Sequence, residues 1–145
     1  MSQHVIERRF QFAMGHRVFQ HESKCRHLHG HNYVLWAIAR AAELDSLGRV
    51  IDFGVLKERI GSWLDAYWDH GFMLFARDEE ALAAVAQVNA TSKVYVLERN
   101  PTAENIAEHF VEDVAPRLMA GTAVRVIGCR LEETENCVAE YRLRD

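Results

Sequence analysis

The sequence predicts one α+β domain, with an antiparallel sheet and two helices in the order strand, strand, helix, helix, strand, strand. Two long apolar-rich segments lack helical spacing, the next two have apolar residues at helical spacing, and the last two are again extended. No period of about 20 to 50 residues repeats, and no low-complexity linker divides the chain. Residues 1–145 are therefore expected to form a single domain.

The first two predicted strands cover His4 to Phe12 and His29 to about Ala42. We expect the first to end near the flexible Ala13-Met14-Gly15, and residues 16–28 to form an irregular polar loop. In the second strand, the apolar residues of the 33–39 segment follow one another without alternation. This pattern indicates that the strand is buried on both faces of the sheet.

The two predicted helices begin at polar capping residues. Asp52 suits the N-cap of the first helix, and Thr102 suits that of the second, with Asn105 three residues further on. Pro116 is expected to weaken or end the last turn of the second helix, which stops near Gly121. The apolar stripe of the first helix is Leu56, Ile60, Leu64 and Tyr67, and that of the second is Ile106, Phe110, Val114 and Leu118.

Two strands, Ala123 to Glu133 and Val138 to Arg142, complete a predicted four-stranded sheet. Between the helices we expect a short helix around Glu80 to Val88 and an extended segment from Lys93 to Leu97. Two helices can cover only one face of such a sheet. Copies of the same chain are the simplest cover for the other face, so the sequence predicts a homo-oligomer.

Composition narrows the function classes. The net charge of −4 argues against a general nucleic-acid surface. No apolar run approaches the roughly 20 residues of a membrane helix, and nothing resembles a signal peptide. Together with an odd count of three cysteines, this predicts a cytoplasmic protein with reduced thiols. If the substrate is a small polyanion, Lys24 and Arg26 are candidate contacts, although both also suit an ordinary charged surface.

The densest cluster of potential metal ligands is at the start of the second strand. His27, His29 and His31 share one side, because alternate residues of a strand point the same way. Residues i and i+2 lie about 6.6 Å apart, a gap that two imidazoles can bridge to one ion, whereas i and i+4 span about 13 Å. One pair from this strand and a third ligand from elsewhere is therefore the better arrangement.

His29 and His31 are the favoured pair, because Gly30 between them leaves room beside the backbone. His16, at the end of the first strand, is the best third ligand, and His4 and His21 are weaker by position. Three nitrogen ligands leave the fourth position of a zinc ion open, as in catalytic sites. The alternative is that these histidines hold no metal, but a cysteine four residues before the pair favours a metal site.

Several motifs occur along the chain in an order that resembles the 6-pyruvoyl-tetrahydropterin synthase superfamily. The resemblance is strongest to its bacterial branch, the 6-carboxy-tetrahydropterin synthases of queuosine biosynthesis. The matching segments are Phe12-Ala13-Met14-Gly15-His16-Arg17, Cys25 through Tyr33, Val50-Ile51-Asp52-Phe53, Asp69-His70, Pro101-Thr102-Ala103-Glu104-Asn105 and Glu133-Thr134. The segment Gly71-Phe72-Met73-Leu74 departs from the more usual polar continuation after Asp-His.

The resemblance implies the tunnelling fold, with a four-stranded antiparallel sheet and two helices on one face. Copies of the chain would close a barrel as a trimer or a dimer of trimers (a homohexamer), with active sites at subunit interfaces. His16, His29 and His31 match the zinc ligands of the family. A zinc ion, Zn2+, is thus the implied cofactor.

The resemblance also implies roles for other residues. Cys25 matches the catalytic cysteine, and Asp69 and His70 match the acid–base partners; the latter two would also suit a helix C-terminus. Glu133 matches the carboxylate that grips the pterin ring. The remaining expected substrate contacts are Thr102 and Glu104, which equally suit the start of a helix.

The implied activity is that of a zinc-dependent carbon–carbon lyase. It would convert 7,8-dihydroneopterin triphosphate to 6-carboxy-5,6,7,8-tetrahydropterin with release of acetaldehyde and triphosphate. Two alternatives stay open: triphosphate elimination to the 6-pyruvoyl product, and a non-catalytic oligomer that binds zinc or a pterin.

Overall fold

The computed structural model describes residues 3–145, whose strands form one mixed sheet in the order β4-β3-β1-β2-β5-β6. Neighbouring strands among β1, β2, β5 and β6 are antiparallel, whereas β3 runs parallel to β1 and β4 parallel to β3. The strands are β1 (Ile6–His16), β2 (His29–Ala41), β3 (Gly71–Phe75), β4 (Val94–Leu97), β5 (Val124–Thr134) and β6 (Cys137–Arg142).

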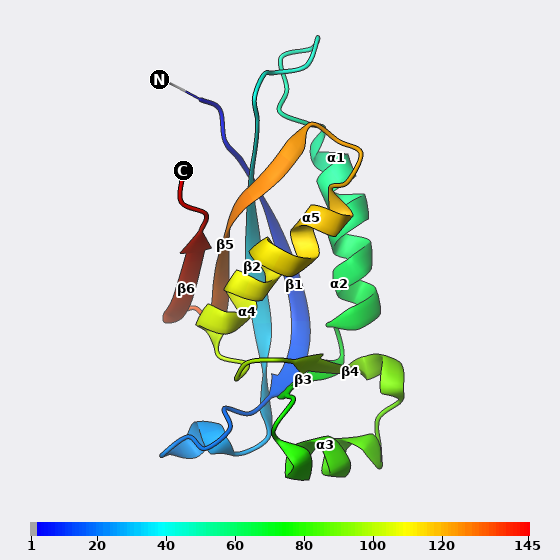
Figure 1. Ribbon diagram of the computed structural model, residues 1–145, viewed down its shortest axis with the longest axis vertical. Helices are drawn as coiled ribbons and strands as arrows, with labels where there is room; N and C mark the ends of the chain where they lie inside the picture. The colour runs from blue at the N-terminus through cyan, green and yellow to red at the C-terminus, as the bar shows by residue number, and fades with distance from the viewer. Residues whose placement is uncertain (1–2) are drawn as a thin grey trace.

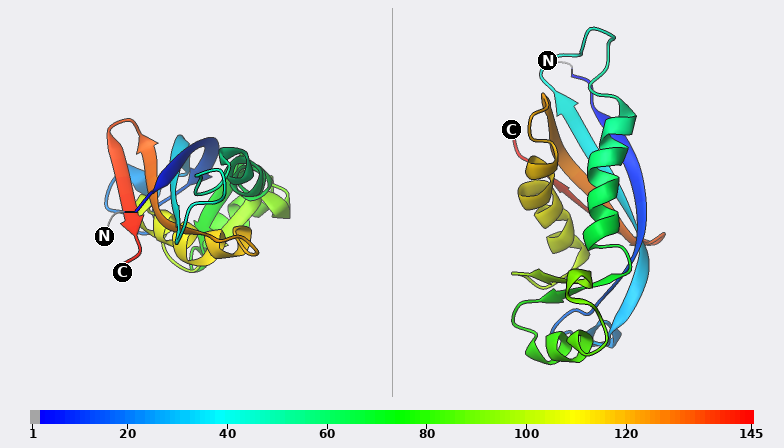
Figure 2. Two further views of the ribbon diagram at one scale, coloured as in Figure 1. Left: turned by 90° about the horizontal axis from the view of Figure 1, so that it is seen from above. Right: turned by 90° about the vertical axis from the view of Figure 1, so that its right-hand side faces the viewer.

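Two long helices lie side by side on one face of the curved sheet (Figures 1 and 2). The first comprises α1 (Phe53–Leu56), a π-helical turn (Lys57–Gly61) and α2 (Ser62–Tyr67). The second comprises α4 (Ala103–His109), a π-helical turn (Phe110–Val114) and α5 (Ala115–Leu118). A third, short helix, α3 (Glu79–Ala86), lies near β3 at the lower end of the molecule, and single 3₁₀ turns occupy Lys24–Arg26 and Thr91–Lys93.

Both predicted helix starts are confirmed by their caps. The Asp52 side chain accepts a hydrogen bond from the Gly54 N–H, and the Thr102 hydroxyl accepts one from the Asn105 N–H. Pro116 lies near the start of α5, just after the π-helical turn, and the helix continues to Leu118. A proline is tolerated there because the first N–H groups of a helical segment have fewer partners to lose.

The expected antiparallel sheet of four strands with two helices is wrong in extent, because the sheet is mixed and has six strands. The short helix expected around Glu80 to Val88 and the extended segment Lys93 to Leu97 are present as α3 and β4, whereas β3 was not predicted. The first strand also runs on to His16 instead of ending at Phe12. Its last residues pair on both sides, with His29 to Asn32 of β2 and with Gly71 to Met73 of β3. Pairing on both sides satisfies the backbone N–H and C=O groups of this glycine-containing stretch. Its side chains alone do not predict a strand.

Burial on both faces of β2 is confirmed. Tyr33, Leu35 and Ala37 face the helices and are fully buried in the main core. On the opposite face, Val34 and Ile38 are also buried within a single chain, with Ile38 only 1% exposed. No helix of the described residues meets the length and apolarity criteria for crossing a membrane.

Candidate active site

Three histidines meet where β1 ends and β2 begins. Antiparallel pairing sets His16 opposite His29, and Met14 opposite His31. Because alternate residues of a strand share a face, all three imidazoles project to the same side. Their ring centroids lie 4.6 to 5.2 Å apart, and one nitrogen of each lies within 4.8 Å of the others.

Two of these rings have a defined tautomer. The Nδ1 of His16 lies 2.8 Å from the Pro101 carbonyl oxygen, and the Nδ1 of His29 lies 2.7 Å from the His27 carbonyl oxygen. A carbonyl oxygen can only accept, so each Nδ1 carries the proton and each Nε2 keeps its lone pair. The contact also explains why His27 is not in the cluster: it serves through its backbone.

Burial favours the neutral forms of His16 and His31. His16 is 1% exposed, and desolvation lowers its pKa to about 4, with smaller lowering contributions from His29 and His31 and an opposing one from the Pro101 hydrogen bond. Desolvation and the nearby His29 likewise lower the pKa of His31. The buried Nε2 of His16 has no hydrogen-bond partner among the described residues.

These features fit a divalent metal ion. Neutral imidazoles with free lone pairs, held by a carbonyl on the other nitrogen, are the usual nitrogen ligands of zinc. A bound ion would also give a partner to the Nε2 of His16, which is buried and accepts no hydrogen bond from the described residues. His16, His29 and His31 are thus the residues that could hold an ion here.

The predicted substrate residues lie beside the histidine cluster. An oxygen of Glu133 is 3.9 Å from the Nε2 of His16. Desolvation, and then the negative charge of Glu104, raise the pKa of Glu133, which His29 partly offsets. Thr102 caps α4, the helix whose first turn carries Glu104. The structure therefore brings Glu133 and Glu104 to one region next to the histidines.

Cys25 lies in the 3₁₀ turn four residues before His29 and is a free, half-buried thiol. Its carbonyl accepts a hydrogen bond from the Val18 N–H, which closes the loop. The loop is also held at Phe19, whose N–H and carbonyl both bond to the Asn100 side chain, at 2.8 and 2.9 Å. The neighbouring Pro101 holds His16, so one segment supports both the cysteine loop and a histidine.

Asp69 and His70 form a second, separate unit. One carboxylate oxygen of Asp69 accepts from the Ala13 N–H at 2.9 Å, and the other lies 2.8 Å from the His70 Nδ1. Desolvation raises the pKa of Asp69, but these two hydrogen bonds outweigh it and the pKa is lowered overall. His70 is 79% exposed and has φ = 59°, a left-handed conformation that few non-glycine residues adopt.

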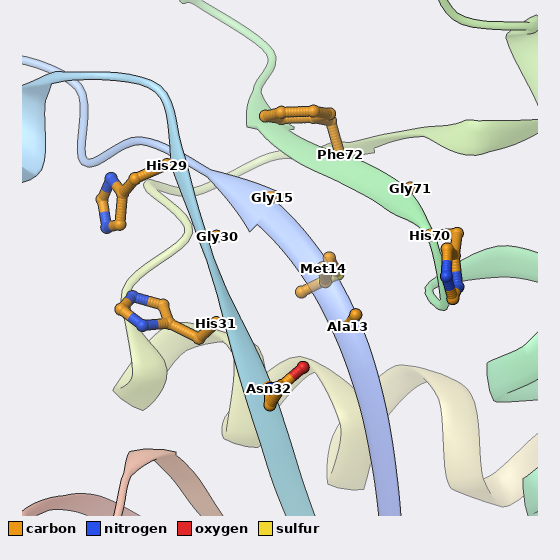
Figure 3. Close-up of a pocket in the computed structure, with 10 residues that line it drawn as sticks. All are labelled: Ala13, Met14, Gly15, His29, Gly30, His31, Asn32, His70, Gly71 and Phe72. Carbon is orange, nitrogen blue, oxygen red and sulfur yellow. The ribbon is translucent and has the colours of Figure 1, made fainter.

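A shallow cleft of about 410 Å³ joins the two regions (Figure 3). The rings of His29 and His31 project to one side of β2, whereas His70 lies on the far side of β1. Phe72 lies close over Gly15 between them, where a Cβ atom on Gly15 would come within 2.4 Å of the ring. Within one chain, His70 is therefore separated from His29 and His31 by β1.

Comparison with known proteins agrees with this geometry. The family model for 6-pyruvoyl tetrahydropterin synthase matches residues 5–144. The chain belongs to this family. A 6-carboxy-5,6,7,8-tetrahydropterin synthase of Rickettsia felis is 41% identical over 133 residues, which cover 92% of this chain and 96% of that protein. A protein of the same description from Aquifex aeolicus is 31% identical over 94% of this chain and 96% of its own length.

A solved structure supports the fold of the family. The 6-pyruvoyl tetrahydropterin synthase of Caenorhabditis elegans superimposes with a TM-score of 0.69 at 22% identity, covering 99% of this chain and 98% of its own. At that identity the likeness concerns the fold alone. The family thus implies a pterin as substrate and supports the sheet and helix arrangement described above.

Some residues of the site were not predicted from the sequence. Asn100 supports the cysteine loop, and Pro101, which was noted only within a matching motif, supports His16. Arg17 forms a two-armed ion pair with the buried Asp78, which caps α3. Tyr33 lies against the rings of His16 and His31. Only Tyr33 carried a usable signal, since it shares the strand face of His29 and His31.

Proposed function

We propose that this chain is a zinc-dependent carbon–carbon lyase. It converts 7,8-dihydroneopterin triphosphate and one water molecule to 6-carboxy-5,6,7,8-tetrahydropterin, acetaldehyde and triphosphate, a step of queuosine biosynthesis. The observation that carries the proposal is the convergence of His16, His29 and His31 in a chain that is 41% identical to a synthase of that description.

Zinc is the metal that we propose for the three histidines. All three donors are imidazoles, and three protein ligands leave a position open for substrate. When bound, the ion acts as a Lewis acid on the hydroxyl groups of the three-carbon side chain.

Glu133 binds the pyrimidine edge of the pterin in this proposal. A carboxylate accepts two hydrogen bonds from adjacent N–H donors, which matches the amino-pyrimidine ring. The half-burial of Glu133 and the 3.9 Å between its oxygen and the Nε2 of His16 support this role. Thr102 and Glu104, at the start of α4, complete the substrate contacts.

The remaining residues move protons. Cys25, as the thiolate, accepts a proton from the substrate side chain, and His70 transfers another. Asp69 orients the His70 ring through its Nδ1 and stabilises positive charge that develops there. Asp69 is well suited to this task, because its lowered pKa keeps the carboxylate ionised at neutral pH.

The same proposal includes a homo-oligomer, a trimer or a dimer of trimers. Since β1 separates His70 from His29 and His31 of its own chain, the Asp69–His70 pair of a neighbouring copy completes each site in this proposal. The second face of the sheet, with Val34 and Ile38 on β2, lines the closed barrel.

A product assay tests the reaction. Purified protein incubated with dihydroneopterin triphosphate should release acetaldehyde and yield the 6-carboxy product. A 6-pyruvoyl product without acetaldehyde would instead identify the pyruvoyl reaction. Cys25→Ala should lose turnover and keep its metal, whereas the matched control Cys137→Ala, an exposed cysteine, should keep both. An oligomer without enzymatic function would show no turnover in any variant.

Mixing two inactive variants tests the shared site. Cys25→Ala and His70→Ala chains, unfolded together and reassembled, should regain about a quarter of the wild-type activity, because random mixing restores that share of the interfaces. No recovery from correctly reassembled oligomers would place both residues in a site within one chain.

A further inference from the structure

Tyr33 is a buried tyrosine whose hydroxyl has no hydrogen-bond partner among residues 3–145. The residue is 0% exposed and lies two positions after His31, on the same face of β2. Its ring stacks on Phe12, with centroids 5.5 Å apart. Phenylalanine would fill the same space without leaving a polar atom unsatisfied, so packing alone does not explain the hydroxyl.

The surroundings of Tyr33 are those of the candidate active site. The rings of His16 and His31 meet it edge-on, with centroid distances of 5.9 and 5.4 Å. On the other side lies β5, where Glu132 pairs with Val34. Tyr33 and Glu133 are the next residues outward in these two strands. The backbone pairing of β2 with β5 ends at Val34 and Glu132, and continuing it by one residue places the two side chains on the same face. The two groups are also near each other, because burial and then the negative charge of Glu133 raise the pKa of the Tyr33 hydroxyl.

Glu133, in turn, is an acceptor that lacks a hydrogen-bond donor among residues 3–145. Its carboxylate is half-buried. The Nε2 of His16 lies 3.9 Å from one of its oxygens, and the nearby charged groups are Glu104 and His29. A free carboxylate can rotate, whereas binding of two adjacent N–H donors requires both oxygens in one plane. The Tyr33 hydroxyl thus lacks an acceptor, and the nearby Glu133 carboxylate lacks a donor.

We propose that Tyr33 is a positioning residue whose hydroxyl donates a hydrogen bond to the Glu133 carboxylate when a pterin ring occupies the site. The bond fixes the orientation of the carboxylate for the pyrimidine N–H donors and so tightens ring binding. Tyr33 need not touch the ligand or the metal. This inference rests on the proposed function, specifically on Glu133 as the ring-binding group.

The test is a double-mutant cycle on metal-loaded protein, with neopterin as the probe and its fluorescence as the readout of the dissociation constant. Tyr33→Phe should weaken neopterin binding about tenfold, as expected for one hydrogen bond to a charged group. Glu133→Gln should weaken it at least as much. Tyr33→Phe in the Glu133→Gln background should add little, because the two residues act as one unit.

Two further measurements separate positioning from a structural role. Because Tyr33→Phe removes an unsatisfied polar atom and keeps the shape, the melting temperature and the zinc content should not fall. Tyr95→Phe is the matched control: it removes a half-buried hydroxyl that bonds to His109, and should leave neopterin binding unchanged.

The outcomes distinguish the inference from the proposed function. Binding that responds to Glu133→Gln but not to Tyr33→Phe, or effects of the two variants that simply add, would overturn the role of Tyr33 alone. A fall in zinc content or melting temperature with unchanged binding would make Tyr33 structural and also overturn it. If neopterin fails to bind the wild-type protein, the proposed function fails and the inference fails with it.

Discussion

The histidine cluster and the Asp69–His70 pair use the same side chain for different chemistry. In the cluster, the Nδ1 atoms of His16 and His29 face neutral carbonyl oxygens. In the pair, the Nδ1 of His70 faces an ionised carboxylate. His16 is almost fully buried between paired strands, whereas His70 projects from a turn into solvent.

The hydrogen-bond partner and the burial of each histidine therefore suit it either to metal binding or to proton transfer. Burial keeps an imidazole neutral and a carbonyl partner holds its proton on Nδ1, so that Nε2 is free, which is what a metal requires. A carboxylate partner stabilises the charge that develops when the ring takes a proton, and in the proposed oligomer the exposed ring would reach a substrate on another copy. The predictions below test this division.

Removing a ring from the cluster should have the largest effect. His29→Ala should reduce bound zinc from about one ion per chain to near zero and turnover to background, because a two-histidine site cannot hold the ion. Metal analysis and the acetaldehyde assay check this. His27→Ala removes the neighbouring histidine, whose ring is outside the cluster, and should keep both metal and turnover. Equal losses in the two variants would contradict the assignment.

Removing the exposed ring should affect turnover alone. His70→Ala should lower kcat by about 10²- to 10⁴-fold, the usual contribution of a positioned proton-transfer group, while zinc content stays unchanged. The exposed His4 provides a control, since His4→Ala should leave kcat as it is. A variant that loses its zinc with the His70 ring would show that the two units are not separate.

The pH dependence of stability should sharpen the contrast in metal-free protein. The pKa of His16 is lowered to about 4 in the fold, against 6.5 for an unperturbed histidine. Its stabilising contribution is therefore complete above pH 6.5 and is lost as the pH falls toward 4, because the unfolded chain then binds the extra proton. Between pH 6.5 and 5 the loss should be roughly 2 kcal/mol. Denaturant unfolding of wild type and His16→Asn, compared at several pH values, measures it; identical curves would contradict it.

The smallest expected effect on turnover is at Asn100, which supports the loop beside the histidine cluster. Asn100→Ala removes two hydrogen bonds to the Phe19 backbone and should cost about 1 to 2 kcal/mol of stability. It should also lower turnover a few-fold, because the loop that carries Cys25 loses its support. Asn136→Ala, at an exposed turn, should change neither. A larger effect on zinc content than on turnover would mean that Asn100 serves His16 instead.

Local patterns in the sequence predicted those parts of the molecule that depend on near neighbours. Alternation along β2 put His29 and His31 on one side, and helix caps at Asp52 and Thr102 marked both long helices. Strand spacing excluded a site of all three strand histidines, and Gly30 favoured the pair His29 and His31 over a pair with His27. These features need only the geometry of a single element.

Features that depend on distant segments were missed. Gly71–Phe75 forms a strand because it pairs in parallel with the end of β1 and with β4, residues far away in the sequence. The same pairing extends β1 to His16. Nothing local to Asn100 or Tyr33 indicates that one reaches Phe19 and the other faces β5. Such contacts are set by the assembled sheet.

The most direct test of the account is X-ray absorption at the zinc edge of the purified protein, combined with metal analysis. The account predicts about one zinc per chain, with three imidazole nitrogens at about 2.0 to 2.1 Å. The histidine signal should fall by one ring in His16→Ala protein that retains any metal. A sulfur ligand in the first shell, or a spectrum unchanged by the loss of His16, would contradict it.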